Sequence, residues 1–385
     1  MIWDIICLAL TAVFFWSMLV VLLGLVKTPK TYRRADKYYH FTVLICARNE
    51  ENVIAFPVKS CLEADYPKDK LRVIVLADNC TDNTKAVAEI SGAEVWEKTT
   101  PSTGKGDVLK WGLDQLKDDT EAVAIFDADN AAYPGWFKAM NNALNDGEKV
   151  VTGCRHSSNA GVNIISGWYT AYWDTMNELS NRVRTNLGLS GKLTGTGFAF
   201  LFELIKEHGW DTYTLVEDVE FTVQCNMAGF RVAYVPDADY DDEQPIEFRA
   251  MWRQLRRWTT GGWQVVRRYF GSWMRAMRAA PSLRLFDSFF AILTGMSVAF
   301  VHFFNFVGLA VNHDWLFTLR IFSSVIVLAW FMGFSAVALS TKGKSPSWLA
   351  IFTFPIFSLI LSAAVLVTIV YPTRKWKPIL HGQGI

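Results

Sequence analysis

Long apolar runs at both ends of the chain restrict its fold more than any other feature of the sequence. They cover about residues 5–26, 285–311, 321–340 and 348–371, and each is long enough to cross a hydrocarbon layer of roughly 30 Å. With 51% hydrophobic and 19% charged residues, the 385-residue chain is too apolar for an ordinary soluble enzyme and too charged for membrane helices alone. The sequence therefore predicts one N-terminal and about three C-terminal membrane helices around a water-facing domain.

Basic residues give the predicted orientation. Five of them follow the first apolar run within residues 27–37, so the positive-inside rule places the next segment in the cytosol. The first run lacks a basic segment before it and a small-residue cleavage site after it, which indicates a retained anchor. Helix parity and the basic residues at 374–377 disagree about the C-terminus. A bend at Pro355 would reconcile them, and the side of the C-terminus stays open.

The six cysteines indicate the redox compartment. None forms a Cys-x-x-Cys pair, and they are scattered through predicted strands and helices. This pattern argues against disulfides and against zinc, and it favours a reducing compartment.

Residues 38–245 alternate apolar runs with helical patterns. Predicted strands cover residues 41–46, 71–77, 95–96, 123–126, 150–152, 198–202 and 231–235. Predicted helices begin at 49–51 and lie at about 84–90, 107–116, 163–184 and 215–229. Strands that alternate with helices predict an α/β fold with a mostly parallel, doubly wound sheet. Ligands bind such sheets at the carboxyl ends of the strands.

Two carboxylates follow the fourth predicted strand in Asp127-Ala128-Asp129. Such a pair repels unless a cation lies between, and a hard divalent ion with oxygen ligands would fit. The simpler interpretation of an isolated Asp-Ala-Asp is a solvated turn. Pro236-Asp237-Ala238-Asp239 repeats the pattern inside an acidic loop, whereas the first copy follows an apolar strand. We therefore place the metal at Asp127 and Asp129.

Other polar residues follow the remaining strand ends. Ala47 to Glu50 follow the first strand, Asp78 the second, and Lys105 the third. Acidic groups, an ion and a lysine suit a nucleoside diphosphate, with Lys105 facing the phosphates. Gly104-Lys105-Gly106 is not a P-loop, and a lone lysine of this kind is more often a solvated loop residue.

Two further segments could complete the site. The glycines of Gly195-Thr196-Gly197 would let backbone approach a ligand closely, although an ordinary turn is the alternative. Glu217, Asp218 and Glu220 open a predicted helix, where acids suit the helix dipole. Three acids exceed what a helix start needs, so one of them could act as a general base beside a cleft.

Residues 249–284 carry nine Arg, no Lys and no acid, interleaved with Trp and Met. Apolar and basic faces at helical spacing predict amphipathic helices in the cytosolic membrane interface. Gln254, Arg257 and Trp258 supply hydrogen bonds, positive charge and a flat apolar face, which suit a diphosphate and a sugar ring. Nucleic acid is a poor alternative because the basic run adjoins the predicted bilayer and the preceding domain is not basic.

These motifs resemble the processive family 2 glycosyltransferases, the group with cellulose, chitin, hyaluronan and poly-N-acetylglucosamine synthases. The matching segments are Ala47 to Glu50, Asp78, Asp127-Ala128-Asp129, Gly195-Thr196-Gly197, Glu217-Asp218, and Gln254 to Trp258 as the family's Q-x-x-R-W signature. Val216 stands where the family has Thr.

The resemblance implies a GT-A fold, a UDP-sugar donor, and Mg2+ or Mn2+ at Asp129 and Asp127. Asp218, beside Glu217, would take the acceptor proton as the anomeric carbon inverts. Lys105 and Arg257 would stabilise the departing UDP, and Trp258 would lie under the acceptor sugar.

We therefore expect a transmembrane anchor at 1–37, a GT-A domain at 38–245, interface helices at 246–284 and a transmembrane region at 285–385. The expected function is transfer of a sugar, with glucose or N-acetylglucosamine favoured, from a UDP-sugar to a growing β-linked glycan at the plasma membrane. The catalytic domain would be cytosolic, with the lipid bilayer as partner and no nucleic acid. The alternatives are transfer of one sugar to a membrane lipid, or a membrane protein whose soluble domain only binds nucleotide. The sequence does not indicate an oligomeric state.

Overall fold

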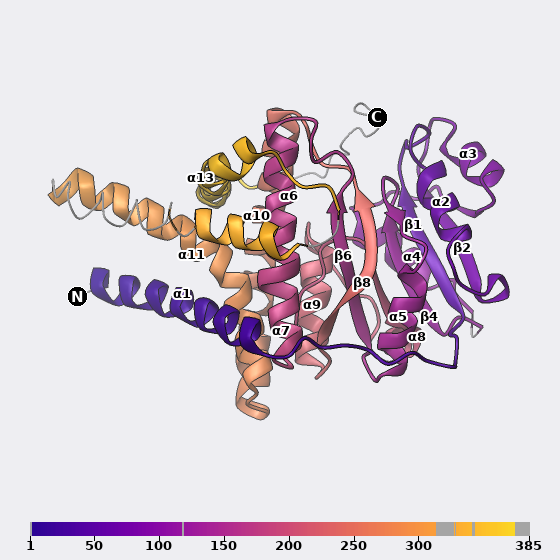
Figure 1. The fold of residues 1–385 in the computed structure, drawn as a ribbon, viewed down its shortest axis with the longest axis horizontal. Coiled ribbons are helices and arrows are strands. Elements are labelled where there is room, and N and C mark those ends of the chain that lie inside the picture. Colours follow the sequence, from indigo (N-terminus) through magenta and orange to yellow (C-terminus); the bar gives the residue numbers. More distant parts are fainter. Residues whose placement is uncertain (1, 118, 313–326, 328, 341–342, 374–385) are drawn as a thin grey trace. The chain divides into compact units, whose positions relative to one another are not determined.

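The computed structural model describes residues 2–117, 119–312, 327, 329–340 and 343–373. Within them the chain forms two compact units (Figure 1). The sheet unit comprises residues 29–159 and 190–243, and the helical unit comprises residues 2–28, 160–189 and the described residues from 244 to 373. Residues 160–189 thus belong to the helical unit, although they lie inside the range 38–245 expected for the catalytic domain.

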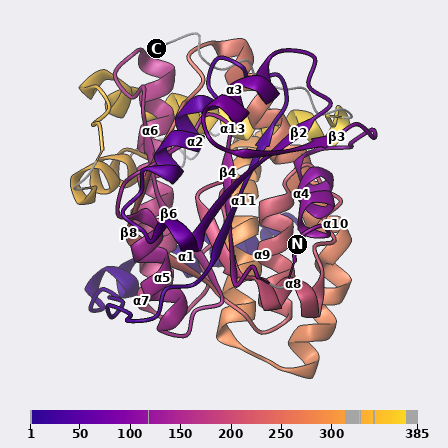
Figure 2. The same cartoon turned by 90° about the vertical axis from the view of Figure 1, so that its right-hand side faces the viewer.

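The sheet unit is an eight-stranded sheet with helices on both faces (Figures 1 and 2). Its strands are β1 Phe41–Ala47, β2 Leu71–Asp78, β3 Glu94–Lys98, β4 Ala122–Asp127, β5 Ala131–Ala132, β6 Val150–Ser157, β7 Phe198–Leu201 and β8 Val232–Asp242. Its helices are α2 Ala55–Leu62, α3 Thr84–Ile90, α4 Lys105–Leu113, α5 Trp136–Asn145, α8 Phe202–His208 and α9 Glu217–Met227, with a 3-10 turn at Lys68–Lys70.

The strand order is β3-β2-β1-β4-β7-β6-β8-β5. Strands β3, β2, β1 and β4 pair in parallel, as do β6 and β8, whereas β7 is antiparallel to both β4 and β6, and β5 is antiparallel to β8. The predicted α/β fold with a mostly parallel sheet is confirmed. Parallel pairing brings the carboxyl ends of β1, β2 and β4 to one edge, because successive strands point the same way.

Side-chain alternation divides the core between the two faces of the sheet. In β1, Phe41, Val43 and Ile45 pack with α2, α3 and α5, while Leu44 packs with α4, α8 and α9. Successive residues of a strand point to opposite faces, so a strand that is apolar at every position must be covered on both. Continuous apolar runs in the sequence therefore predict that helices cover both faces of the sheet.

Two strands are longer than predicted. β6 continues past Thr152 to Ser157, and β8 continues past Val235 to Asp242. The prediction of an acidic loop after Val235 is therefore wrong. Residues 239–242 of β8 pair with β6, and Tyr240 and Asp241 also pair with β5. The acidic residues have the composition of a solvated loop, but they pair as a strand, and Asp239 and Asp242 are buried against His156 and Arg155.

The first helix of the sheet unit, α2, also begins later than predicted. It starts at Ala55 and not at Asn49, since Asn49 has a φ of 58°, outside the helical region. The Asn49 side chain instead accepts a hydrogen bond from the Thr81 backbone N–H at 2.8 Å. This contact joins the loops that follow β1 and β2.

The helical unit contains long helices. They are α1 Ile2–Val26, α6 Ile164–Met176, a π-helical turn at Asn177–Arg182, α7 Val183–Asn186, α10 Phe248–Ala279, α11 Leu283–Asn312, Ala329–Leu339 and α13 Trp348–Val370. The predicted helix at 163–184 is confirmed as α6 and its continuation. The Asn163 side chain starts it by accepting from the backbone N–H groups of Ile165 and Ser166.

A buried ion pair joins three helices of this unit. Asp287, at the start of α11, has no exposed surface and accepts hydrogen bonds from Arg184 of α7 at 2.9 Å and Trp16 of α1 at 3.0 Å. A buried carboxylate is costly unless it is paired. The buried negative charge of Asp287 is thus compensated by the Arg184 guanidinium and the Trp16 indole N–H.

Among the described residues, α13 is long and apolar enough to cross a membrane, and it runs unbroken through Pro355. The structure therefore does not support a bend there. Leu283–Thr294 and Met296–Phe303, bent by 45°, would make a second candidate if counted as one span. The apolar part of α1, Phe15–Val26, is shorter, and most of the predicted span at 321–340 lies outside the described residues. The number of membrane helices remains a prediction.

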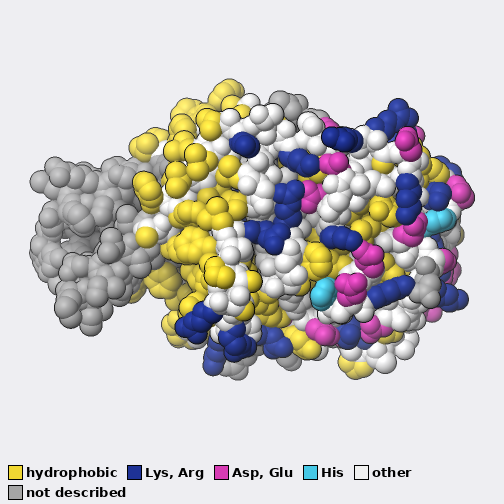
Figure 3. Space-filling view, turned by 90° about the horizontal axis from the view of Figure 1, so that it is seen from below, with side chains coloured by type: hydrophobic (Ala, Val, Ile, Leu, Met, Phe, Trp, Pro, Cys, Tyr) yellow, Lys and Arg dark blue, Asp and Glu magenta, His cyan; other side chains and the backbone are white. Residues whose placement is uncertain are grey.

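The two units differ in surface character. Among described residues of the sheet unit, the exposed large hydrophobic side chains are Phe56, Ile90 and Tyr213, whereas the helical unit exposes such side chains along α1, α10, α11 and α13. Figure 3 shows hydrophobic side chains gathered over the helical unit, while charged side chains of both signs cover the sheet unit. Large exposed apolar surfaces mark contact with a membrane or another protein.

Candidate active site

Lys105 is the point at which four segments of the sheet unit meet. It is the first residue of α4, and its ammonium group pairs with the Asp127 carboxylate at the end of β4. The same nitrogen donates to the Gly195 carbonyl at 2.6 Å and lies 4.0 Å from the Glu217 carboxylate of α9. Burial alone would lower the pKa of Lys105, but Asp127 and Glu217 outweigh it and raise that pKa. Lys105 is therefore a mostly buried, ion-paired cation and not a solvated loop lysine.

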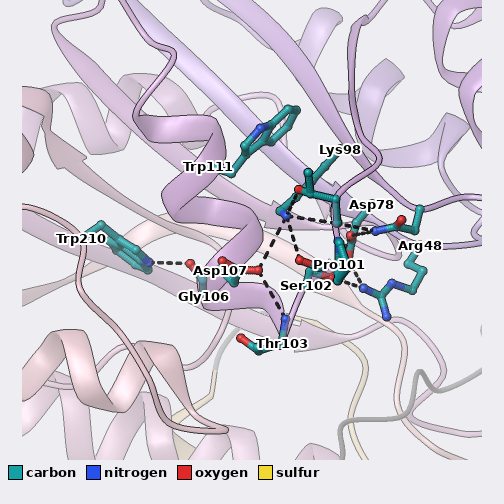
Figure 4. A network of polar contacts seen from close by, with 12 residues as sticks. Arg48, Asp78, Lys98, Pro101, Ser102, Thr103, Gly106, Asp107, Trp111 and Trp210 are labelled. Atoms are coloured by element: carbon teal, nitrogen blue, oxygen red, sulfur yellow. Dashed lines mark hydrogen bonds and ion pairs between the residues drawn. The ribbon is translucent and has the colours of Figure 1, made fainter.

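The loop that carries Lys105 is fixed at several points (Figure 4). The Lys98 ammonium group lies 3.7 Å from the Asp107 carboxylate, and the Thr103 backbone N–H donates to Asp107 at 3.3 Å. The Trp210 indole donates to the Gly106 carbonyl at 3.2 Å. A side chain at Gly106 would collide with Thr212, so the close approach of α4 to the loop that contains Thr212 requires glycine.

The end of β4 is tied to the glycine loop by a small buried network. The Asp127 backbone N–H donates to Asn130 Oδ1 at 2.8 Å and to Thr196 Oγ1 at 2.9 Å. The Thr196 hydroxyl also contacts Asn130, and Thr196 is fully buried. The side chain of Thr196 thus holds the loop to β4.

The glycines on either side of Thr196 are required by the backbone. Gly195 and Gly197 have φ values of 91° and 63°, which L-residues rarely adopt. A Cβ at Gly197 would also overlap the ring of Tyr240. The loop is a tight turn packed closely against β4 and Tyr240, and a backbone contact with a ligand stays a prediction.

Three carboxylates lie close enough to influence each other at this edge. The pKa of Asp242 on β8 is raised to about 6 by burial, and Asp129 and Asp127 add to the increase. Arg155 of β6 opposes the shift: its Nε donates to Asp242 at 3.0 Å. Asn130 also donates to Asp242, at 2.7 Å. The sequence did not identify Arg155 or Asp242 as site residues.

The acids of α9 divide into different environments. Glu220 is fully buried and accepts the backbone N–H groups of Tyr213 and Thr214 at 2.8 and 2.7 Å, so it organises the preceding loop. Glu217 is the acid near Lys105. Asp218 is partly exposed, and its Oδ2 would lie 3.8 Å from a Cβ built on Gly195. The structure thus brings Asp218 beside the glycine loop.

Asp78, at the end of β2, is held by Arg48, from the segment identified after β1, and by Ser102, which the sequence did not identify. Its two oxygens accept from Ser102 Oγ at 2.8 Å, and it pairs with Arg48 (Figure 4). Ala47 ends β1, and the Glu50 backbone N–H donates to Thr84 at 2.8 Å. Ala47 and Asp78 are thus the last residues of β1 and β2, and Glu50 lies in the loop that follows β1.

Gln254, Arg257 and Trp258 lie on α10 of the helical unit at spacings that place them on one face of a helix. The Trp258 ring stacks on Tyr172 with centroids 6.1 Å apart and meets Trp173 edge-on at 5.7 Å. The aromatic residues of α6 are thus core packing for α10 and α13, one of the interpretations considered from the sequence. Gln254 Oε1 is buried and has no hydrogen-bond partner among the described residues. The convergence of this helix face with Asp127 remains a prediction.

Comparison with known families decides the membership of the chain. Residues 39–261, more than half of the sequence, match the family described as "Glycosyltransferase like family 2". The chain belongs to glycosyltransferase family 2. The enzyme family predicted from the strand-end acids and the Q-x-x-R-W signature is thereby confirmed, and the matched range includes every residue assigned above to the site.

Curated relatives of this family 2 chain have several names. A probable glycosyltransferase, YdaM of Bacillus subtilis, is 27% identical over 68% of this chain and 64% of that protein. A beta-monoglucosyldiacylglycerol synthase of Synechocystis is 26% identical over 61% of this chain and 50% of that protein. A poly-beta-1,6-N-acetyl-D-glucosamine synthase of Staphylococcus aureus is 24% identical over 67% and 63%. The chain therefore spans between half and two thirds of the length of these relatives.

A solved structure confirms the fold of the family 2 chain. The mannosyltransferase PcManGT from Pyrobaculum calidifontis, in complex with GDP-Man and Mn2+, superposes with a TM-score of 0.61. The match covers 95% of this chain and 98% of that one at 18% sequence identity. The chain thus has the GT-A-like α/β fold predicted for it.

Proposed function

We propose that the chain transfers a sugar, with glucose or N-acetylglucosamine favoured, from a UDP-sugar to the end of a growing β-linked glycan. The observation that supports this most is the convergence of Lys105, Asp127, Gly195 and Glu217 from four segments, with Asp218 beside them. A cation, carboxylates and a candidate base on rigid elements suit a reaction in which a diphosphate departs.

The donor would lie along the edge formed by the ends of β1, β2 and β4. Ala47, Glu50 and Asp78 would contact the uridine, since they lie at or just after the carboxyl ends of β1 and β2. Lys105 would turn from Asp127 toward the diphosphate. Gln254, Arg257 and Trp258 would complete the donor and acceptor sites from α10, and the buried, unpartnered Gln254 Oε1 supports a ligand contact there.

The acidic residues fit a divalent ion. The carboxylates of Asp127 and Asp129 both raise the pKa of Asp242, so negative charge accumulates here despite Lys105 and Arg155. Oxygen ligands of this kind prefer Mg2+ or Mn2+. Asp129 and Asp127 would hold the ion, which when bound would neutralise charge on the diphosphate.

The chain's own residues would carry out the transfer. Asp218 would accept the proton of the acceptor hydroxyl while that oxygen bonds to the anomeric carbon and the bond to UDP breaks, inverting the centre. Glu217 would keep Lys105 charged, and Lys105 and Arg257 would stabilise the departing UDP. Gly195, Thr196 and Gly197 would border the acceptor through their backbone, with Trp258 beneath its sugar ring.

The acceptor has two candidates. Similarity to the poly-beta-1,6-N-acetyl-D-glucosamine synthase of Staphylococcus aureus supports a glycan end as the acceptor. Similarity to the beta-monoglucosyldiacylglycerol synthase of Synechocystis supports a membrane lipid that receives one sugar. The exposed hydrophobic side chains of the helical unit and the apolar α13 support an integral membrane enzyme with a cytosolic catalytic domain in either case. The plasma membrane is the proposed location.

Product analysis tests this function. Full-length protein purified in detergent is incubated with UDP-glucose, UDP-N-acetylglucosamine or GDP-mannose, with Mg2+ or Mn2+, and with membrane lipid or oligosaccharide acceptors. We expect UDP release with one UDP-sugar and a ladder of β-linked products by mass spectrometry. A single monoglycosylated lipid would establish the second candidate. Absence of transfer from every donor would refute the proposal.

A further inference from the structure

A second group of ligand-type side chains lies on strands β6 and β8. Cys154 and His156 are two residues apart on β6 and therefore share one face, and Asp239 of β8 is the register partner of Cys154. The His156 Nε2 and Asp239 Oδ1 atoms are 2.8 Å apart. Among the described residues, these three form a group whose potential ligand atoms all lie within 4.8 Å of one another.

This group is separate from the carboxylates assigned to the donor ion. Arg155 lies between Cys154 and His156, so its side chain points to the opposite face of β6, where it contacts Asp242 and the Thr194 carbonyl. The face with Cys154 is closed to solvent: Cys154, His156 and Asp239 are 6%, 4% and 7% exposed.

The chemistry of the three side chains selects a particular kind of ion. Thiolate and imidazole ligands favour Zn2+, whereas Mg2+ and Mn2+ prefer the oxygen ligands of Asp127 and Asp129. The alternative without an ion is that His156 hydrogen-bonds to both Asp239 and the Cys154 thiol. A buried thiol, imidazole and carboxylate whose ligand atoms converge also form a donor set that Zn2+ accepts.

A fourth ligand is available close by. The Tyr133 ring lies 5.9 Å from the His156 ring, and the Tyr133 hydroxyl is 3.5 Å from an Asp241 carboxylate oxygen. Zinc sites with three protein ligands usually complete a tetrahedron with an oxygen. Tyr133, Asp241 or water could occupy that position.

We propose that Cys154, His156 and Asp239 bind a zinc ion that fastens β6 to β8. Zinc would replace the His156–Asp239 hydrogen bond and separate the two atoms to roughly 3.4 Å, as tetrahedral bonds of about 2.1 Å require. The sequence argued against zinc because it lacks a Cys-x-x-Cys pair. Parallel pairing of β6 with β8 supplies the third ligand from a distant segment instead. The ion would hold the strands that carry Arg155 and Asp242 at the donor edge.

Cobalt binding tests the site independently of the proposed enzymatic activity. Full-length protein is treated with a chelator and titrated with Co2+, which replaces Zn2+ and absorbs in the near ultraviolet when a thiolate coordinates it. We expect one equivalent of Co2+ with this thiolate band, and loss of the band when Zn2+ is added. Co2+ that binds without a thiolate band would have only nitrogen or oxygen ligands, and this result would refute the site.

Variants identify the ligands. Cys154→Ser should abolish the band, and Asp239→Asn should weaken Co2+ binding at least tenfold. Cys225→Ser is the matched control, because Cys225 is also a buried free cysteine but lies in a different part of the core. A band that survives in Cys154→Ser, or disappears in Cys225→Ser, would overturn the assignment. If Cys154→Ser does not fold, the wild-type spectrum alone still decides whether a thiolate binds the metal.

Discussion

Arg155 and Asp242 form a buried ion pair on neighbouring parallel strands, with side chains 10% and 3% exposed. The Asp242 carboxylate also accepts from Asn130, which in turn accepts the backbone N–H of Asp127. The pair therefore connects β6 and β8 to the first acidic motif. It places a fixed positive charge behind the acidic edge of the sheet.

Removing the guanidinium should destabilise the sheet unit. Arg155→Gln would remove the group that lowers the pKa of Asp242, so this carboxyl would have to stay charged beside Asp127 and Asp129 or take up a proton. Breaking a buried ion pair in this way costs about 3 to 5 kcal/mol. The melting temperature, followed by intrinsic fluorescence, should fall by several degrees. Arg72→Gln is the matched control, since Arg72 pairs with Glu94 on the same sheet with side chains 38% and 45% exposed. That exposed pair should contribute about 1 kcal/mol at most. Equal losses for the two variants would contradict a special role of the buried pair.

The raised pKa of Asp242 predicts a pH dependence of stability. In the folded protein this pKa is about 6, above the value of about 3.9 expected in an unfolded chain. The folded state then holds a proton that the unfolded chain has lost, so this stabilisation is complete below pH ~4 and disappears as the pH rises through ~6. Asp242→Asn does not titrate, so its stability relative to the wild type should increase between pH 4 and 7, by up to about 3 kcal/mol.

Thermal unfolding of both proteins across this pH range in chelator-containing buffer measures the difference. The loss of the Arg155 partner in Asp242→Asn adds an offset that does not vary with pH. Asp237→Asn, at an exposed position of β8, is the control and should show no such trend. A constant difference between wild type and Asp242→Asn would show that Asp242 does not titrate in this range.

Lys105→Met should reduce turnover strongly without unfolding the protein. The methionine keeps most of the apolar length but removes the charge between Asp127, Glu217 and the expected diphosphate. Loss of one such electrostatic contact typically costs on the order of 100-fold in kcat. Lys110→Met tests specificity, because Lys110 lies on the same helix and pairs with the exposed Asp211. UDP release should be near wild type in that control, and comparable activity of the two variants would remove Lys105 from the site.

The clustering of several candidate site residues at one sheet edge could be predicted because it depends on local patterns. An apolar strand followed by polar residues identified Asp78, Lys105 and Asp127, and alternation with helices predicted that they share one edge. Arg155 and Asp242 could not be found in this way, since their roles depend on how far β6 and β8 extend and on which strand pairs with which. Asp241 and Asp242 lie in an acidic run that has the composition of a loop, and only the pairing with β6 and β5 shows that it is a strand.

The two copies of Asp-Ala-Asp should behave differently. Asp127→Asn and Asp129→Asn should each weaken Mn2+-dependent UDP binding, measured by calorimetry, by at least tenfold, because these carboxylates face the acidic edge. Asp237→Asn should leave UDP binding unchanged, since Asp237 is exposed on β8. Asp239, the other acid of that copy, is buried against His156. Weaker binding in Asp237→Asn with normal binding in Asp127→Asn would assign the donor ion to the second copy.

Asp218→Asn separates chemistry from donor binding. The amide keeps the size of the carboxylate but cannot accept the acceptor proton, and general-base catalysis typically contributes 10² to 10⁴-fold. Transfer should therefore fall by about this factor, while the Kd for UDP stays within twofold of wild type. Asp211→Asn is the control, because Asp211 is exposed and pairs with Lys110 ahead of the same helix. If Asp218→Asn transfers sugar at the wild-type rate, the base must be another group, and Glu217, 4.0 Å from Lys105, would be the next candidate.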